Sequence, residues 1–363
     1  MKHLKPYTST IIIAALLLII ASCRKEIDFD LKLIASQMVV NSFVESDSII
    51  TVHLAGSKPI PGIKSDFNWI KNANIKLYVD GVEKETLKAF EIESESNNEN
   101  YYYYNRFSGN TPTVEYRSEL RAESGRTYKL EIEHPDYEVV TCETTVPEPV
   151  EIALIDTTYS DAERWYHGRK NLGVKLKFND PANTANYYRL VSHIRNGKYE
   201  ERNYNMEQES YVYIEERYVI LTDPVLIPKQ EDANDFLSGS MENIYNIFTD
   251  QLIDGKEYSI NVDFNVWDPE RRDTINLLDL GEFYEITIML QSINHDTYLF
   301  LKSSYEHLYY SDDLFAEPVQ VYSNVNNGRG IFGASSSSVV KFIKGTYPMD
   351  DVDYRESNYY YYW

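Results

Sequence analysis

Two stretches of sequence decide the fold class: residues 125–132 read Gly-Arg-Thr-Tyr-Lys-Leu-Glu-Ile, and residues 255–262 read Gly-Lys-Glu-Tyr-Ser-Ile-Asn-Val. Each begins with a glycine that suits a tight turn and continues with a tyrosine that leads a run of alternating apolar and polar residues. Such alternation predicts half-buried β-strands. In Greek-key sandwiches a tyrosine at such a corner often hydrogen-bonds back to the backbone. The similarity of the two stretches favours two related β-sandwiches.

The same alternation recurs along most of the chain. Strands are predicted at residues 37–43, 49–54, 74–79, 128–133, 137–146, 172–178, 187–194, 211–221, 258–266 and 284–291. Asp80-Gly81 is typical of a hairpin turn. The Pro-Glu-Pro at residues 147–149 interrupts the pattern, because proline cannot donate to a β-ladder. We therefore expect an all-β protein with a minor helix, in which two tandem Greek-key β-sandwich domains, immunoglobulin- or fibronectin-like, occupy residues 36–149 and 150–343.

One helix is predicted near residues 295–309, because four residues repeat there at helical spacing. These residues are Tyr298, Leu301, Tyr305 and Leu308. Asn294 or Asp296 is the expected N-cap. An aromatic stripe of this kind is expected to pack against a sheet rather than to bind a ligand.

Length and charge exclude several functions. The chain has 363 residues, of which 43% are hydrophobic and 25% charged, so it is globular, and two domains are expected at this length. It contains 35 Lys and Arg residues and 57 Asp and Glu residues, so its net charge is −22. A body this acidic repels nucleic-acid phosphates and anionic lipid headgroups. We therefore expect no nucleic-acid partner.

The first residues have the pattern of an export signal. Lys2 and Lys5 precede an apolar run at residues 11–20 that is too short to span a bilayer as a helix. Residues 20–23, Ile-Ala-Ser-Cys, resemble the lipobox of bacterial lipoproteins, whose cysteine is acylated on its thiol. This predicts a signal peptide at residues 1–22 and a tether at 23–35, anchored to the lipid bilayer through Cys23. The alternative is an ordinary signal peptide with an incidental cysteine.

The residues after Cys23 bear on where the protein is displayed. Residues 24–28, Arg-Lys-Glu-Ile-Asp, imperfectly resemble the acidic signal that sends Bacteroidota lipoproteins to the cell surface. The alternative is a charged tether without a signal. We expect an outer-membrane location, at the cell surface rather than on the periplasmic face.

Two motifs have the spacing of known catalytic or cofactor signatures. Gly328, Gly330 and Gly333 match a dinucleotide-binding loop, but that loop requires a following helix, and the next residues make a poor helix start. Ser338 and Lys341 match Ser-x-x-Lys without its companion motifs, so a strand is expected.

The metal-binding and nucleophilic residue types show no functional arrangement in the sequence. The 7 histidines lack zinc-type spacing, and the acidic residues at 350–353 lack the glycine and the terminal glutamate of a calcium loop. Cys142 lies in an alternating run, where a lone cysteine behaves as a small hydrophobe. We expect no cofactor, no metal and no enzymatic activity.

The chain contains 32 tyrosines, and two clusters of them are candidates for ligand binding. Residues 101–104 are four consecutive tyrosines after a polar loop, and the Tyr-rich tail at 344–363 ends in a second cluster. Alternate residues of a strand point to opposite faces, so about half of each cluster would be exposed. The alternative is core packing. The candidate ligand-binding residues are Tyr102, Tyr104, Tyr360, Tyr362 and Trp363.

Several stretches resemble a known family. Residues 315–325 (FAEPVQVYSNV), 327–333 (NGRGIFG), 39–43 (VVNSF) and 186–189 (NYYR) resemble the Bacteroidota lipoproteins of domain-of-unknown-function family 4249. The resemblance runs from Cys23 to about Gly333, while the tail departs from it. It implies an outer-membrane lipoprotein that is typically encoded beside a TonB-dependent transporter, and it carries over no catalytic residues. It also explains the glycines as tight turns in a closing β-segment.

Three functional hypotheses follow. The first is an accessory ligand-capture subunit of a TonB-dependent outer-membrane transporter. The alternative is a surface adhesin or structural module that binds a glycan or a host protein. A hydrolase ranks last.

Overall fold

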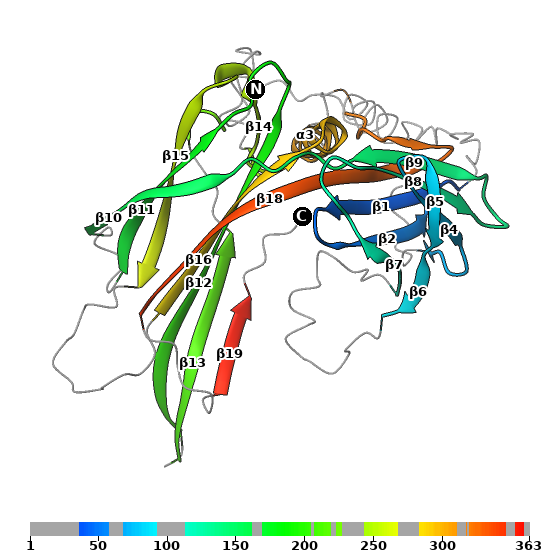
Figure 1. Cartoon of the computed structure of the whole chain (residues 1–363). Helices are drawn as coiled ribbons and strands as arrows, with labels where there is room; N and C mark the ends of the chain where they lie inside the picture. The colour runs from blue at the N-terminus through cyan, green and yellow to red at the C-terminus, as the bar shows by residue number, and fades with distance from the viewer. Residues whose placement is uncertain are drawn as a thin grey trace, which may run out of the picture. The chain divides into compact units, whose positions relative to one another are not determined.

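Over the residues that it describes, the computed structural model is a body of strands with one α-helix (Figure 1). The described residues are 36–57, 68–92, 113–161, 169–204, 207–218, 223–226, 243–267, 283–310, 317, 319–345 and 353–358. Ser36–Trp363 is one compact unit, separate from Met1–Ala35. The expected all-β class with a minor helix is confirmed. Within the described ranges, none of the helices reaches the length and apolar character of a membrane span.

The described strands form three sheets. The long sheet has the order β19 (Asp353–Asn358), β13 (Glu207–Tyr218), β12 (Tyr187–Tyr204), β16 (Phe283–Ile293), β18 (Arg329–Gly345), β1 (Met38–Glu45), β2 (Ile49–Gly56), β7 (Val114–Arg121) and β6 (Lys88–Glu91), with β14 (Ile247–Thr249) beside β12 and β3 (Asn68–Trp69) beside β2. The second sheet has the order β17 (Val325–Asn326), β9 (Val140–Thr145), β8 (Thr127–Glu133), β4 (Asn74–Val79) and β5 (Val82–Thr86). The third has the order β10 (Ile152–Asp161), β11 (Arg169–Asn179) and β15 (Glu257–Trp267).

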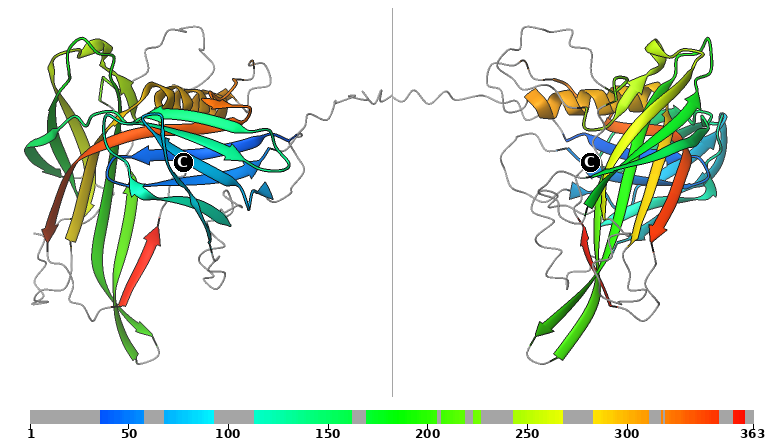
Figure 2. Two further views of the ribbon diagram at one scale, coloured as in Figure 1. Left: turned by 45° about the vertical axis from the view of Figure 1, so that its right-hand side comes forward. Right: turned by 90° about the vertical axis from the view of Figure 1, so that its left-hand side faces the viewer.

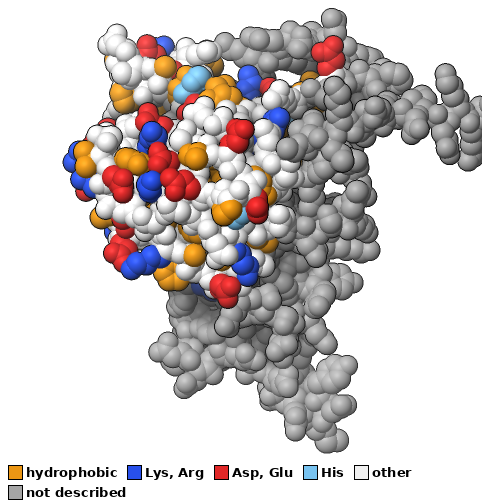
Figure 3. Space-filling view, turned by 90° about the vertical axis from the view of Figure 1, so that its right-hand side faces the viewer, with side chains coloured by type: hydrophobic (Ala, Val, Ile, Leu, Met, Phe, Trp, Pro, Cys, Tyr) orange, Lys and Arg blue, Asp and Glu red, His pale blue; other side chains and the backbone are white. Residues whose placement is uncertain are grey.

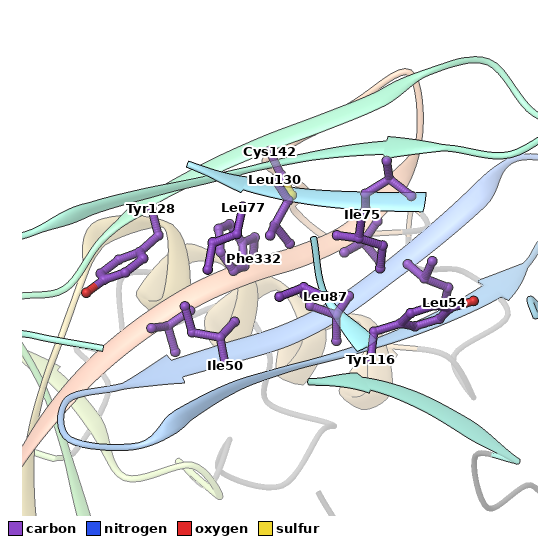
Figure 4. Packing of buried hydrophobic residues seen from close by; sticks show 14 of the residues in the cluster. Ile50, Leu54, Ile75, Leu77, Leu87, Tyr116, Tyr128, Leu130, Cys142 and Phe332 are labelled. Atoms are coloured by element: carbon purple, nitrogen blue, oxygen red, sulfur yellow. The ribbon is translucent and has the colours of Figure 1, made fainter. Parts of the chain in front are cut away.

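Two hydrophobic cores lie between these sheets. In the first, Leu77, Leu130 and Cys142 of the second sheet pack with residues of the long sheet, including Phe332 (Figure 4). In the second core, strands β10, β11 and β15 pack on β12 and β16. The first core draws mainly on residues 38–146 and the second on 150–290, and strand β18 contributes to both. The two sandwiches therefore share one strand and one sheet.

The local sequence signals agree with the structure at several strands. Strand β4 covers the predicted residues 74–79, and Asp80 and Gly81 have φ angles of 49° and 78°. Positive φ at both central residues is what a type I′ hairpin turn requires, so this hairpin prediction is confirmed. Strand β9 is shorter than predicted, because it begins only at Val140.

Tyr128 and Tyr258, the tyrosines of the two similar stretches, make different contacts. The hydroxyl of Tyr128 accepts a 2.7 Å hydrogen bond from the backbone N–H of Glu123, as expected at a tyrosine corner. The hydroxyl of Tyr258 instead donates to the Asp223 carboxylate at 2.8 Å. Both tyrosines follow a glycine with positive φ, Gly125 at 75° and Gly255 at 66°. Both stretches thus share a turn followed by a strand. The tyrosine hydroxyl of the first bonds to a backbone N–H, whereas that of the second bonds to a carboxylate.

The helix α3 (His295–Tyr310) lies on the face of the long sheet that is turned away from the cores (Figure 2). A Cβ at Gly333 would face Thr297 of α3, whereas the neighbouring Phe332 and Ala334 belong to the first core. Alternate residues of a strand point to opposite faces, so helix and core lie on opposite sides of β18.

The predicted N-cap of α3 is confirmed, and the predicted stripe is confirmed for three of its four residues. Asn294 is the N-cap: its Oδ1 accepts a 3.0 Å hydrogen bond from the N–H of Thr297. Of the predicted stripe, Tyr298, Leu301 and Tyr305 pack in an aromatic cluster on the sheet. Leu308 does not, because it is 57% exposed near the helix end.

Candidate functional site

The sequence-predicted site residues lie outside the part of the chain that the structure describes. They are Cys23, Tyr102, Tyr104, Tyr360, Tyr362 and Trp363. The described residues on either side of Tyr102 and Tyr104 in sequence are Ile92 and Thr113. The N–H of Ile92, after β6, donates a 3.0 Å hydrogen bond to the carbonyl of Thr113, before β7. These two residues therefore lie side by side at one end of the β6–β7 pair.

A row of polar and aromatic side chains crosses the long sheet beside this point. Asn41 of β1 pairs in register with His53 of β2, and Glu115 of β7 pairs with Phe90 of β6. The Nε2 of His53 lies 3.6 Å from Oε2 of Glu115, which joins the two pairs. We call these four residues and the adjacent Arg117 the outer-face row.

Strand alternation places the outer-face row on the side away from the first core. Val52 and Leu54, on either side of His53, are fully buried in that core. Tyr116, between Glu115 and Arg117, is also buried there. Its hydroxyl accepts a 3.0 Å hydrogen bond from the N–H of Ala73 and donates one of 3.0 Å to the Ile70 carbonyl. These two hydrogen bonds hold Tyr116 on the core side of β7. Its sequence neighbours Glu115 and Arg117 therefore point to the outer face.

The charges within the row are arranged around one carboxylate. Glu115 is only 9% exposed and contacts both the guanidinium of Arg117 and the imidazole of His53. The side chain of Arg117 is 43% exposed, and its Cζ lies 5.0 Å from the centre of the Phe90 ring. An arginine held between a carboxylate and an aromatic face is pre-organised, and its guanidinium carries further N–H donors.

The outer face of the second sheet differs from this row. Lys76 there forms ion pairs with Glu131 at 3.2 Å and Glu133 at 3.1 Å, and Arg126 pairs with Asp80 at 2.6 Å. Figure 3 likewise shows acidic and basic side chains interspersed over the face that it displays. Exposed pairs of this kind contribute little to stability and are typical of a solvated surface.

No sequence motif marks the outer-face row. Its members come from four strands, and only the register between those strands brings them together. A weak signal exists: His53 and Glu115 each occupy the outward position of a strand whose inward positions are apolar or small.

Cys142 behaves as the alternation predicts. Its side chain is buried in the first core, and burial raises the pKa of its thiol to about 12. The thiolate is the nucleophilic form of cysteine, so a thiol held protonated at neutral pH serves packing rather than catalysis.

Three aspartates form an acidic cluster at the loops of the second sandwich. Asp180, Asp250 and Asp254 have carboxylate oxygens within 4.8 Å of one another, a set that suits a hard cation. The same oxygens also accept hydrogen bonds from the loops around them. Asp180 accepts from Tyr188 Oη at 2.6 Å, Asp250 from the N–H of Asn186 at 2.7 Å, and Asp254 from the N–H of Asn183 at 3.1 Å. These hydrogen bonds give the three aspartates a structural role, because they hold the surrounding loops together. We call the aspartates and their donors the loop tie.

The fold defines the class of protein: β-sandwiches that share a sheet, with one helix on its outer face. The chain belongs to the family described as a domain of unknown function, DUF4249, whose model matches residues 24–340. No curated protein matches the chain. The resemblance inferred from the sequence motifs is confirmed at the level of the family. Asp180, Asn186 and Tyr188 of the loop tie described above lie within the range that the family model matches.

Proposed function

We propose that the mature chain is a lipid-anchored binding protein of the outer membrane that captures a ligand for a TonB-dependent transporter. The lipobox-like residues 20–23 support the anchor, and the family match begins one residue after Cys23. Display at the cell surface, as in lipoproteins of Bacteroidota, is part of this proposal.

The structural observation that carries the binding role is the outer-face row, in which Arg117 lies between the Glu115 carboxylate and the Phe90 ring. Arginine and aromatic side chains are residue types that contribute strongly to binding surfaces. Tyr102 and Tyr104 belong to the proposal on the sequence argument alone.

The physical benefit of the anchor is local concentration. Residues 23–35 extend at most about 45 Å between Cys23 and the body at Ser36. A tethered body therefore meets a neighbouring membrane protein at an effective concentration in the millimolar range. Capture followed by transfer then needs only modest intrinsic affinity.

The test is affinity purification of the acylated protein from detergent extracts of its own cells. Recovery of a TonB-dependent transporter supports the proposal, and Cys23→Ala should abolish both the acyl group and the co-purification. If the wild-type protein repeatedly recovers no transporter while it binds glycan or matrix protein, the adhesin alternative takes its place.

A further inference from the structure

We propose that the outer-face row is a subsite for a neutral saccharide. This inference rests on the proposed binding function and names the ligand class of that function. The row consists of Asn41, His53, Phe90, Glu115 and Arg117, and neither the family match nor the sequence motifs assign it a role.

Phe90 supplies the apolar part of the row. The residue is 43% exposed on β6, at the edge of the long sheet. Arg117 is stacked near the ring, so the ring is held in place rather than free to rotate away. A rigid, partly exposed aromatic ring offers a flat apolar surface at low entropic cost. The C–H face of a pyranose ring is a matching flat apolar surface.

The polar side chains of the row present mainly hydrogen-bond donors. The two oxygens of Glu115 face Arg117 and His53, and the residue is nearly buried, so its charge is compensated within the row. The side chains that remain exposed are those of Arg117 and Asn41 and, in part, that of His53. These are mainly hydrogen-bond donors, and they match a ligand that is rich in acceptor oxygens.

The charges of the row and of the whole chain favour a neutral ligand. Arg117 alone would favour an anionic ligand, but its positive charge is already paired with the Glu115 carboxylate. The chain carries a net charge of −22, which disfavours the approach of a polyanion. A ligand with hydroxyl acceptors, an apolar ring face and no net charge therefore fits the row better than a uronic acid or a phosphate ester.

The experiment uses the full acylated protein in detergent, probed first on an array of neutral and uronic-acid oligosaccharides and then by calorimetry with the best neutral one. We expect binding of a neutral oligosaccharide. Phe90→Ala should weaken it about tenfold, the upper range for loss of one aromatic contact. Arg117→Gln should weaken it as well, and Phe90→Tyr should restore it.

Phe43 supplies the matched control. It is 44% exposed on the same face of the long sheet, two residues after Asn41 on β1, but its ring packs on α3, with its centre 6.0 Å from that of the Phe300 ring. Phe43→Ala should leave saccharide affinity unchanged. Equal losses in Phe43→Ala and Phe90→Ala, binding of uronic acids only, or no saccharide binding at all would overturn the inference. Transporter co-purification is scored separately, so the capture role can stand if the saccharide assignment fails.

Discussion

Gly330 of β18 lies in register with Val40 of β1 in a parallel pair, and its backbone has a φ of 103°. A Cβ at this position would collide with the carbonyl group of Val40. This contact joins the first strand of the body to the strand that runs through both cores, so the glycine is required both by its backbone angle and by the space around it.

Gly330→Ala should therefore destabilise the protein by about 3 kcal/mol or more, because backbone strain and overpacking add. Denaturant unfolding followed by fluorescence measures the loss. Gly81→Ala is the matched control: Gly81 also has a positive φ, of 78°, but nothing lies within 4 Å of its Cβ position. That substitution should cost only about 1–2 kcal/mol for the left-handed backbone. Equal losses would show that the space beside Val40 is not limiting.

Tyr188→Phe should destabilise the second sandwich. The substitution removes the hydroxyl that donates to Asp180 at 2.6 Å and leaves a buried carboxylate oxygen with one donor fewer. A loss of about 1–3 kcal/mol is expected for a buried acceptor of this kind. Thermal unfolding checks the value. Tyr78→Phe, which changes a partly exposed tyrosine on the outer face of the second sheet, should leave the melting temperature almost unchanged.

Stability should fall as the pH rises through the range 10–12. Burial, and then the hydrogen bonds to Asp223 and Asp296, raise the pKa of Tyr258 and of Tyr322 from 10 to about 12. In this window the unfolded chain releases these protons while the folded chain keeps them, so the free energy of unfolding decreases with pH. Denaturant titrations at several pH values measure the slope.

The same pH experiment has an internal control. The double variant Tyr258→Phe and Tyr322→Phe should be less stable at pH 8, because two hydrogen bonds are lost. Its stability should also depend less steeply on pH between 10 and 12. An unchanged slope in the double variant would assign the alkaline loss to other tyrosines.

The strands, the hairpin at Asp80-Gly81 and the cap at Asn294 could be predicted from sequence because each depends on neighbours along the chain. The tyrosine corner at Tyr128 belongs to the same group, since its partner Glu123 is five residues away. Local chemistry alone selects these structures.

The shared sheet and the outer-face row could not be predicted in this way. The parallel pairing of β1 with β18 joins residues almost 300 positions apart, for example Val40 and Gly330. Nothing in either strand specifies its partner, because alternation defines a face and not a register. For the same reason His53, Phe90 and Glu115 carry no joint signal in sequence, although the sheet places them side by side.

The junction between the two cores is held by serine hydroxyls, which leads to the last prediction. The N–H groups of Val150 and Ile152 donate to Ser292 Oγ at 3.2 Å and to Ser338 Oγ at 3.0 Å. Both backbone groups are buried, so Ser338→Ala should leave the Ile152 N–H without its acceptor, at a cost of about 1–3 kcal/mol. Hydrogen exchange at Ile152 should accelerate.

Ser337→Ala is the control for this prediction. Ser337 lies in the same serine run but bonds to the side chains of Glu45 and Gln291 on the other face of β18, so no buried backbone donor loses its partner. We expect its effect on stability to be smaller and exchange at Ile152 to be unchanged. If the two variants accelerated that exchange equally, the segment after Pro149 would be held by packing on the second core rather than by hydroxyl groups of β18.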